Sequence, residues 1–277
     1  CRLQGEREEV AQAIYEHYLP LGAGKKIPQT IIGVILSIAD KIDNIVGYFG
    51  IGLTPTGGED PYALRRHTLG IISILLQREI NLNLDDLISK SIDLYQEKLL
   101  RQRKDILKEV KEFFAQRLYY YLLSLGYKPD ILEGVISEGL HDIKEATERI
   151  KVITLLKEDP DFYPFIIAYK RVANILASKA KGGEVNEELL AEEAERKLFQ
   201  TYLDVSLKSE GYLKKGDYFA YLKEILRLKG TIDNFFDSVL VMTEDRAIRE
   251  NRLSLLAKIQ GLFLKVADFS KIVVEGS

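Results

Sequence analysis

The sequence has few of the residues that define several protein classes. Its one cysteine, Cys1, excludes an intrachain disulfide framework and fits a reducing compartment, so we expect a cytoplasmic protein. Apolar runs are short: residues 31–39 are interrupted by Gly33 and Ser37, so no membrane-spanning segment is expected. With three scattered histidines and no local Ser–His–acid motif, nucleophilic catalysis has no support.

No charge of one sign dominates. A net charge of −3 gives no general attraction to nucleic acid or membranes, so binding of that kind would need a local patch. The 277 residues have the apolar and charged fractions of a soluble globular protein, 46% and 29%. The chain starts without methionine and runs directly into a helical pattern, from which we expect a piece of a longer protein.

Helical periodicity of apolar residues extends along nearly the whole chain, and no segment alternates as a strand does. The sequence therefore predicts an all-α, multi-helical fold. Asp159-Pro160 is expected to mark a domain boundary, and Lys181-Gly182-Gly183 a flexible joint. The predicted helices are 6–18, 29–49, 61–78, 84–100, 104–125, 129–139, 142–157, 162–181, 184–195, 217–228, 231–242 and 245–269.

Residues 37–66 contain the most informative pattern. Small and polar residues recur at helical spacing on an otherwise apolar helix, which indicates that another group approaches that face. They are Gly33, Ser37, Asp40, Asn44 and Gly47. A glycine-rich loop follows, and Asp60-Pro61 predicts the start of the next helix.

This stretch also predicts a polar contact between helices. An ionised carboxylate on an apolar helix needs a cation or strong donors, so Asp40 requires a partner. A metal, a protonated His17, or Arg65 and Arg66 remain open, with a structural contact of Asp40 or Asp43 to Arg65 or Arg66 favoured over a metal. The loop glycines lack the lysine and Ser/Thr of a phosphate-binding loop, so we expect a tight turn that needs positive φ.

Basic residues near the C-terminal end form a second candidate site. Phosphate contacts need such charges, and unpaired bases need aromatic platforms, here Tyr212, Tyr218 or Tyr221. An ordinary lysine-rich surface is the alternative, and Asp245 and Arg249 can pair with each other. The glutamate-rich run 184–195 is expected to be a solvated helix face. The basic candidates are Arg246, Arg249, Arg252, Lys258 and Lys265, preceded by Lys214, Lys215, Lys223, Arg227 and Lys229.

Several motifs in this order resemble the beta subunit of bacterial heterotetrameric glycyl-tRNA synthetase. They bracket almost the whole chain and are specific in combination. The matching runs are Glu16-His-Tyr-Leu-Pro20, Ala39-Asp-Lys-Ile-Asp43, Gly47-Tyr-Phe-Gly-Ile-Gly52, Pro55-Thr-Gly57, Asp60-Pro-Tyr-Ala-Leu-Arg-Arg66, Phe235-Phe-Asp-Ser-Val-Leu-Val-Met-Thr-Glu-Asp245 and Arg249-Glu-Asn-Arg-Leu-Ser-Leu-Leu-Ala-Lys258.

The resemblance implies three regions. Residues 1–80 would be the C-terminal half of an HD-like helical domain, 81–158 a helical connecting region, and 159–277 an anticodon-binding domain of the arginyl-tRNA-synthetase type. His17 and Asp40 would be vestigial members of the HD metal pattern, whose earlier residues would lie upstream of Cys1. We therefore expect no complete metal site, no catalytic residue and no cofactor in this piece.

The function implied is tRNA binding within a glycine–tRNA ligase, an aminoacyl-tRNA synthetase of protein biosynthesis. This portion would position glycine tRNA, through its anticodon arm, for ATP- and Mg-dependent aminoacylation with the alpha subunit, and would be inactive alone. The implied phosphate contacts are Arg246, Arg249 and Arg252, with Lys258 a weaker candidate. The alternatives are a fragment of an HD-superfamily metal-dependent phosphohydrolase and a purely structural helical module.

Overall fold

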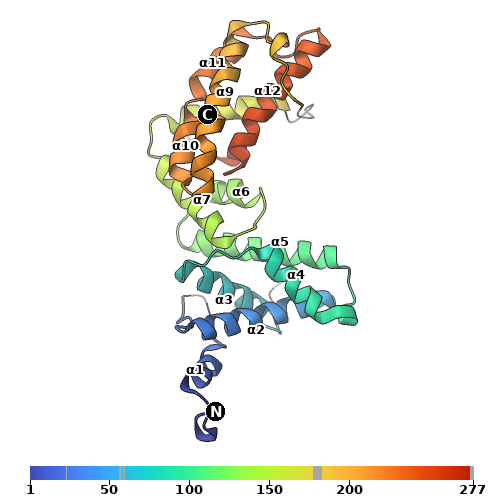
Figure 1. The fold of residues 1–277 in the computed structure, drawn as a ribbon, viewed down its shortest axis with the longest axis vertical. Coiled ribbons are helices and arrows are strands. Elements are labelled where there is room, and N and C mark those ends of the chain that lie inside the picture. Colours follow the sequence, from blue (N-terminus) through green and yellow to red (C-terminus); the bar gives the residue numbers. More distant parts are fainter. Residues whose placement is uncertain (23, 56–57, 59, 177–182, 275–277) are drawn as a thin grey trace. The chain divides into compact units, whose positions relative to one another are not determined.

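The computed structural model describes residues 1–22, 24–55, 58, 60–176 and 183–274. Within these ranges the chain is helical, apart from an isolated β-bridge between Asn83 and Asp142 (Figure 1). The predicted all-α class is confirmed. No described helix combines the length and the apolar character needed to cross a membrane. The chain divides into two compact units, Cys1–Gly126 with Gly139–Thr147, and Tyr127–Glu138 with Glu148–Ser277.

The first unit is organised around the helix α2 (Ile31–Gly50). Four other helices pack against it: α1 (Glu8–Glu16), α3 (Leu64–Gln77), α4 (Leu84–Tyr95) and α5 (Arg103–Ser124). The apolar side chains of α2 are buried at steps of three and four residues, and α5 contributes a matching buried stripe from Ile106 to Leu122. The elements of this unit are η1 (Arg2–Gln4), α1 (Glu8–Glu16), α2 (Ile31–Gly50), α3 (Leu64–Gln77), α4 (Leu84–Tyr95), η2 (Gln96–Lys98) and α5 (Arg103–Ser124).

The stripe of small residues on α2 is a contact face, as its spacing predicts. The Glu16 carboxylate lies where a side chain at Gly33 would project, and the Tyr95 hydroxyl occupies the corresponding space at Gly47. Between them, the Ser37 hydroxyl donates to the Leu19 carbonyl over 2.6 Å. A larger residue at either glycine would displace the neighbouring element.

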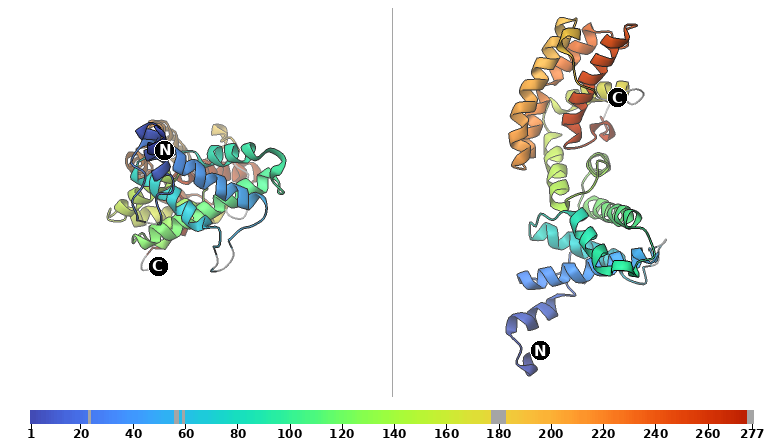
Figure 2. Two further views of the ribbon diagram at one scale, coloured as in Figure 1. Left: turned by 90° about the horizontal axis from the view of Figure 1, so that it is seen from below. Right: turned by 45° about the vertical axis from the view of Figure 1, so that its right-hand side comes forward.

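In the second unit, α10 (Tyr218–Leu226) and α11 (Lys229–Ser238) both pack against α9 (Glu193–Lys214) (Figure 2). Helix α12 (Arg246–Leu264) packs against α8 (Phe162–Leu176) and α9. The core of this unit contains an aromatic cluster in which the Phe165 and Tyr169 rings lie 4.9 and 4.7 Å from that of Phe263. The elements are α6 (Pro129–Ile136), α7 (Ile143–Leu156, whose first residues belong to the first unit), α8 (Phe162–Leu176), η3 (Glu187–Leu189), α9 (Glu193–Lys214), α10 (Tyr218–Leu226), α11 (Lys229–Ser238), α12 (Arg246–Leu264) and η4 (Phe269–Lys271).

The contact-based units differ from the predicted domains 1–80, 81–158 and 159–277. Helices α4 and α5 pack against α2 and α3, so residue 80 does not separate compact parts. Helix α6 and most of α7 belong with the C-terminal helices, which places the division well before Asp159. Periodicity locates helices, but it does not reveal which of them share a core.

Two helix starts also differ from prediction. Helix α3 begins at Leu64 rather than Pro61, because Ala63 adopts a left-handed conformation with φ of 59°. Asp60 still caps the helix: its carboxylate accepts from the Leu64 and Arg65 amides over 2.8 and 3.0 Å. Helix α9 runs from Glu193 to Lys214, so residues 184–195 are not one helix, and residues 196–214 are helical although no helix was predicted there.

The glycine-rich loop after α2 is a turn at Gly52, whose φ is 82°, as predicted for a position that requires positive φ. Thr56 and Gly57 of this loop lie outside the described residues, as do Lys181 and Gly182 of the predicted joint.

Candidate nucleic-acid interface

Helix α12 carries all four predicted phosphate-binding residues, and its N-terminus is fixed by Asp245. The Asp245 carboxylate accepts hydrogen bonds from the Ala247 and Ile248 amides over 2.9 and 3.1 Å, which satisfies two free donors of the first turn. Arg249 donates instead to the carbonyls of Thr243 and Glu244, at 2.7 and 3.4 Å. Both side chains of the expected Asp245–Arg249 pair therefore make backbone contacts.

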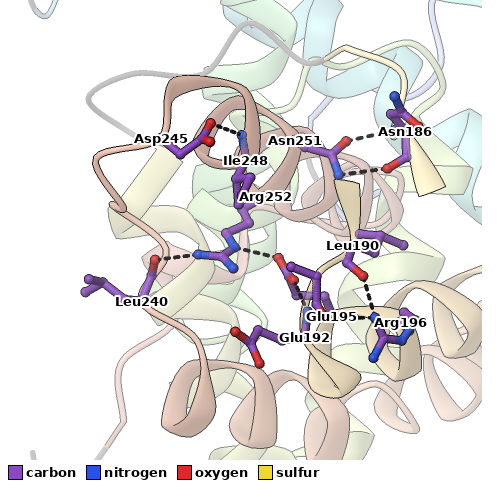
Figure 3. Close-up of polar contacts among 11 residues, drawn as sticks. Asn186, Leu190, Glu192, Glu195, Arg196, Leu240, Asp245, Ile248, Asn251 and Arg252 are labelled. Carbon is purple, nitrogen blue, oxygen red and sulfur yellow. Dashed lines mark hydrogen bonds and ion pairs between the residues drawn. The ribbon is translucent and has the colours of Figure 1, made fainter. Parts of the chain in front are cut away.

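Arg252 is an internal side chain, only 6% exposed. Its Nε donates to Glu195 Oε1 over 2.5 Å and its Nη1 to the Leu240 carbonyl over 2.9 Å (Figure 3). Glu195 is fully buried, and its other oxygen accepts from the Glu192 amide over 2.7 Å at the start of α9. The expectation that Arg252 faces a phosphate is thus corrected: its charge is used to hold α9 and the segment before α12 together.

Asn251 extends these internal contacts, and the exposed Arg196 binds the segment just before α9. The Asn251 side chain donates to the Asn186 carbonyl over 2.9 Å and accepts from the Asn186 amide over 2.7 Å (Figure 3). Arg196 donates to the Leu190 and Ala191 carbonyls at 2.6 and 2.9 Å. Glu195 and Asn186 tie the glutamate-rich run 184–195 to α12. The other five glutamates of the run are exposed, as expected for a solvated face: Glu184, Glu187, Glu188, Glu192 and Glu193. Glu192 and Glu195, three residues apart before an apolar run, were the sequence signal for this capped helix start.

Arg246 is on the surface, whereas Lys258 is half-buried. Arg246 is 81% exposed and bonds Glu250 over 2.7 Å, one turn along the same helix. The Lys258 side chain is 26% exposed, and its ammonium lies 2.9 Å from the carboxylate of Glu184, which is 94% exposed. An exposed pair such as Arg246–Glu250 contributes little to stability, so a phosphate can replace its carboxylate at small cost.

Four of the five cations in the second group pair with neighbouring acids, and Lys214 bonds Glu210 over 2.7 Å. Lys223 bonds Asp159, Arg227 bonds Asp204 and Glu224, and Lys229 lies 3.4 Å from Asp233. This surface is mixed in charge rather than basic.

Two of the three tyrosines proposed as base-stacking platforms are buried. Tyr218 is 8% exposed, and Tyr221 is fully buried with its hydroxyl donating to the Leu262 carbonyl over 2.7 Å. Burial raises the pKa of Tyr221 well above its usual value. Tyr212 is half-buried. Tyr218 and Tyr221 are core residues, which corrects that expectation.

Two charged side chains are buried among the described residues of the first unit, Glu16 and Lys41. Lys41 is the cation. Its side chain is 2% exposed, and its ammonium donates to the His17 and Leu19 carbonyls and the Ser37 hydroxyl at 3.0, 2.9 and 2.8 Å. Burial lowers the pKa of Lys41 to about 8. Asp40 is half-buried and Asp43 exposed, so neither requires the buried partner that was predicted.

Arg66 does share a cavity of about 230 Å³ with Asp40, Lys41 and His67, whereas the Arg65 amide bonds Asp60. The vestigial metal candidates are His17 and Asp40. His17 is half-buried with Nδ1 2.5 Å from the Ile14 carbonyl, which requires that nitrogen to donate. Within the described ranges, no group of three or more His, Cys, Asp or Glu side chains is arranged to hold a metal.

The second unit falls into a known class of helical domain. Residues 165–268, from α8 through α12, match the family described as the DALR anticodon binding domain. Residues 1–137 match the family described as the glycyl-tRNA synthetase beta subunit.

Comparisons with individual proteins over nearly the whole of this chain agree with both matches. The chain is 44% identical over 273 residues to the glycine–tRNA ligase beta subunit of Syntrophus aciditrophicus, covering 99% of this chain and 39% of that protein. It is 42% identical over 270 residues to the Geotalea daltonii subunit and 39% over 273 to that of Clostridioides difficile, covering 98% and 99% of this chain. The chain belongs to the glycyl-tRNA synthetase beta subunit family, and it spans about 39% of the length of these relatives.

Proposed function

We propose that this chain is a tRNA-binding portion of a glycine–tRNA ligase, which binds glycine tRNA and positions its anticodon arm for aminoacylation. The observation that carries the proposal is the anticodon-binding match over α8 to α12. The complete ligase would use ATP and Mg and would include the alpha subunit, so this portion alone is expected to bind without catalysing.

The surface geometry supports a limited set of phosphate contacts. Of the four predicted phosphate contacts on α12, Arg246 and Lys258 pair with exposed acids, and Arg249 is half-buried with its guanidinium directed to backbone carbonyls. Few phosphate contacts predict a modest dependence of affinity on salt. Neither the relatives' names nor the geometry favours a phosphohydrolase of the HD type.

Fluorescence anisotropy with labelled glycine tRNA tests the proposal. We expect binding that weakens with salt, and competition by glycine tRNA that exceeds competition by an unrelated elongator tRNA. Equal competition would reduce the proposal to non-specific RNA binding, and no binding at low salt would overturn it. Footprinting on the bound tRNA should protect the anticodon arm.

A further inference from the structure

The segment between α11 and α12 alternates between buried and exposed side chains. Val239 and Val241 are 6% and 5% exposed, whereas Leu240 and Met242 are 75% and 41% exposed. Val239 has extended backbone angles, φ −120° and ψ 123°, and successive side chains of an extended chain point to opposite sides. The two valines anchor the segment in the core and direct two large apolar side chains outward.

Buried and half-buried arginines of α12 fix the backbone of this segment. Arg252 bonds the Leu240 carbonyl, and Figure 3 shows the Leu240 side chain pointing away from that guanidinium. Arg249 bonds the carbonyls of Thr243 and Glu244, and Asp245 caps α12 at the end of the segment. Single exposed leucines are common on protein surfaces. Here, however, two exposed apolar side chains belong to a segment whose backbone is held by hydrogen bonds to three of its carbonyls.

Exposed carboxylates flank the segment. The Asp237 side chain is 71% exposed and bonds Arg171 over 3.2 Å, and Glu244 is exposed. Carboxylates repel phosphates, but they accept hydrogen bonds from the amino groups on base edges, while the faces of unstacked bases pack on apolar side chains. Single-stranded bases fit this combination of apolar tips and surrounding acceptors.

We propose that Leu240 and Met242 form a base-contacting tip, which packs against unpaired nucleobases in a loop of the bound tRNA. The proposal rests on the proposed tRNA-binding function. It adds which residues make the contact and which part of the tRNA, the nucleobases, they contact. The tip lies within residues 165–268, the part of the chain that matches an anticodon-binding domain. Arg249 and Arg252 are positioning residues in this arrangement, because they hold the backbone without facing the ligand.

The test compares Leu240→Ala and Met242→Ala with Leu207→Ala, a matched control on α9 that is 77% exposed. We expect the tip variants to weaken glycine-tRNA binding on the order of tenfold, because apolar contact area is lost. The slope of log affinity against log salt should stay unchanged, since no phosphate contact is removed. The Leu207→Ala variant should bind as the wild type does.

A second measurement uses tRNA whose anticodon loop bases are replaced one at a time. If the wild type discriminates against a replacement, the tip variants should lose that discrimination. Unchanged affinity and discrimination in both variants, with wild-type tRNA binding intact, would overturn the base-contacting tip and leave the proposed function standing. A change in sedimentation without a change in tRNA affinity would instead assign the surface to a second copy of the chain. Absence of wild-type binding would overturn both proposals.

Discussion

Arg252 and Glu195, 57 residues apart in sequence, form a buried ion pair in which the guanidinium Nε lies 2.5 Å from the carboxylate. The same two side chains also bond the Leu240 carbonyl and the Glu192 amide. Three chain segments therefore meet at one charge pair: the start of α9, the segment before α12, and α12 itself. Stability and the geometry of the candidate RNA surface are linked at this point.

Removing one member of this pair should be costly. Arg252→Met would leave Glu195 buried without its counter-charge, and we expect the free energy of unfolding to fall by about 3–5 kcal/mol. Urea unfolding followed by circular dichroism measures the change. The double variant Arg252→Met with Glu195→Gln should recover part of the loss, because no unpaired charge remains. A single-variant loss below about 1 kcal/mol would mean that the pair is solvated.

Lys41 should make stability depend on alkaline pH. Because burial lowers its folded-state pKa to about 8 from 10.5, the unfolded chain binds more protons between these values. Stability should therefore rise as the pH increases from 8 to 10.5, by about 3 kcal/mol in total for this group.

The control for Lys41 is Lys41→Met, which lacks the titrating group while other groups titrate as before. The difference in unfolding free energy between wild type and variant, measured by urea unfolding at several pH values, isolates the lysine. Parallel curves for the two proteins across this pH range would contradict the assignment of a lowered pKa.

Gly33 should tolerate no side chain. An alanine Cβ would overlap the Glu16 carboxylate and the Thr30 hydroxyl, so we expect Gly33→Ala to destabilise the protein by about 1–3 kcal/mol. Gly211 in α9 is the matched control, because nothing lies near its Cβ position. Gly211→Ala should stabilise by about 0.5–1 kcal/mol, as expected for a helix interior. Thermal unfolding of both variants gives the comparison, and equal shifts would disprove the close approach at Gly33.

Arg246 should contribute one phosphate contact, if the proposed tRNA binding holds. Arg246→Ala is expected to weaken binding and to reduce the salt slope by roughly 0.7–0.9, the value for one released counterion. Arg7→Ala is the control, since Arg7 has a similarly exposed side chain, 80% against 81%, and also pairs with a glutamate. Anisotropy titrations at several salt concentrations measure the slope. An equal reduction in both variants would indicate a general charge effect.

The helices that carry the candidate site could be located from the sequence. Which of their charged residues are buried and which are exposed could not be predicted. The positions of α2 and α12 followed from apolar spacing, and the small-residue face of α2 was read from Gly33 and Gly47. Arg252 lies three residues after Arg249, and that spacing alone groups it with the exposed Arg246. It also lies on the stripe of Leu256, Ile259 and Phe263, and that second reading is the one the structure supports.

The sequence by itself determined the all-helical class, the positions of most helices other than α9 and, through motifs in a fixed order, the family. These depend on local periodicity and residue identity. Only the tertiary structure decided which charges are internal. Lys41 rather than Asp40 is buried, because the carbonyls of His17 and Leu19 converge on its ammonium. Arg252 can be buried because Glu195, far away in the chain, supplies a counter-charge that offsets the free-energy cost of removing the guanidinium from water.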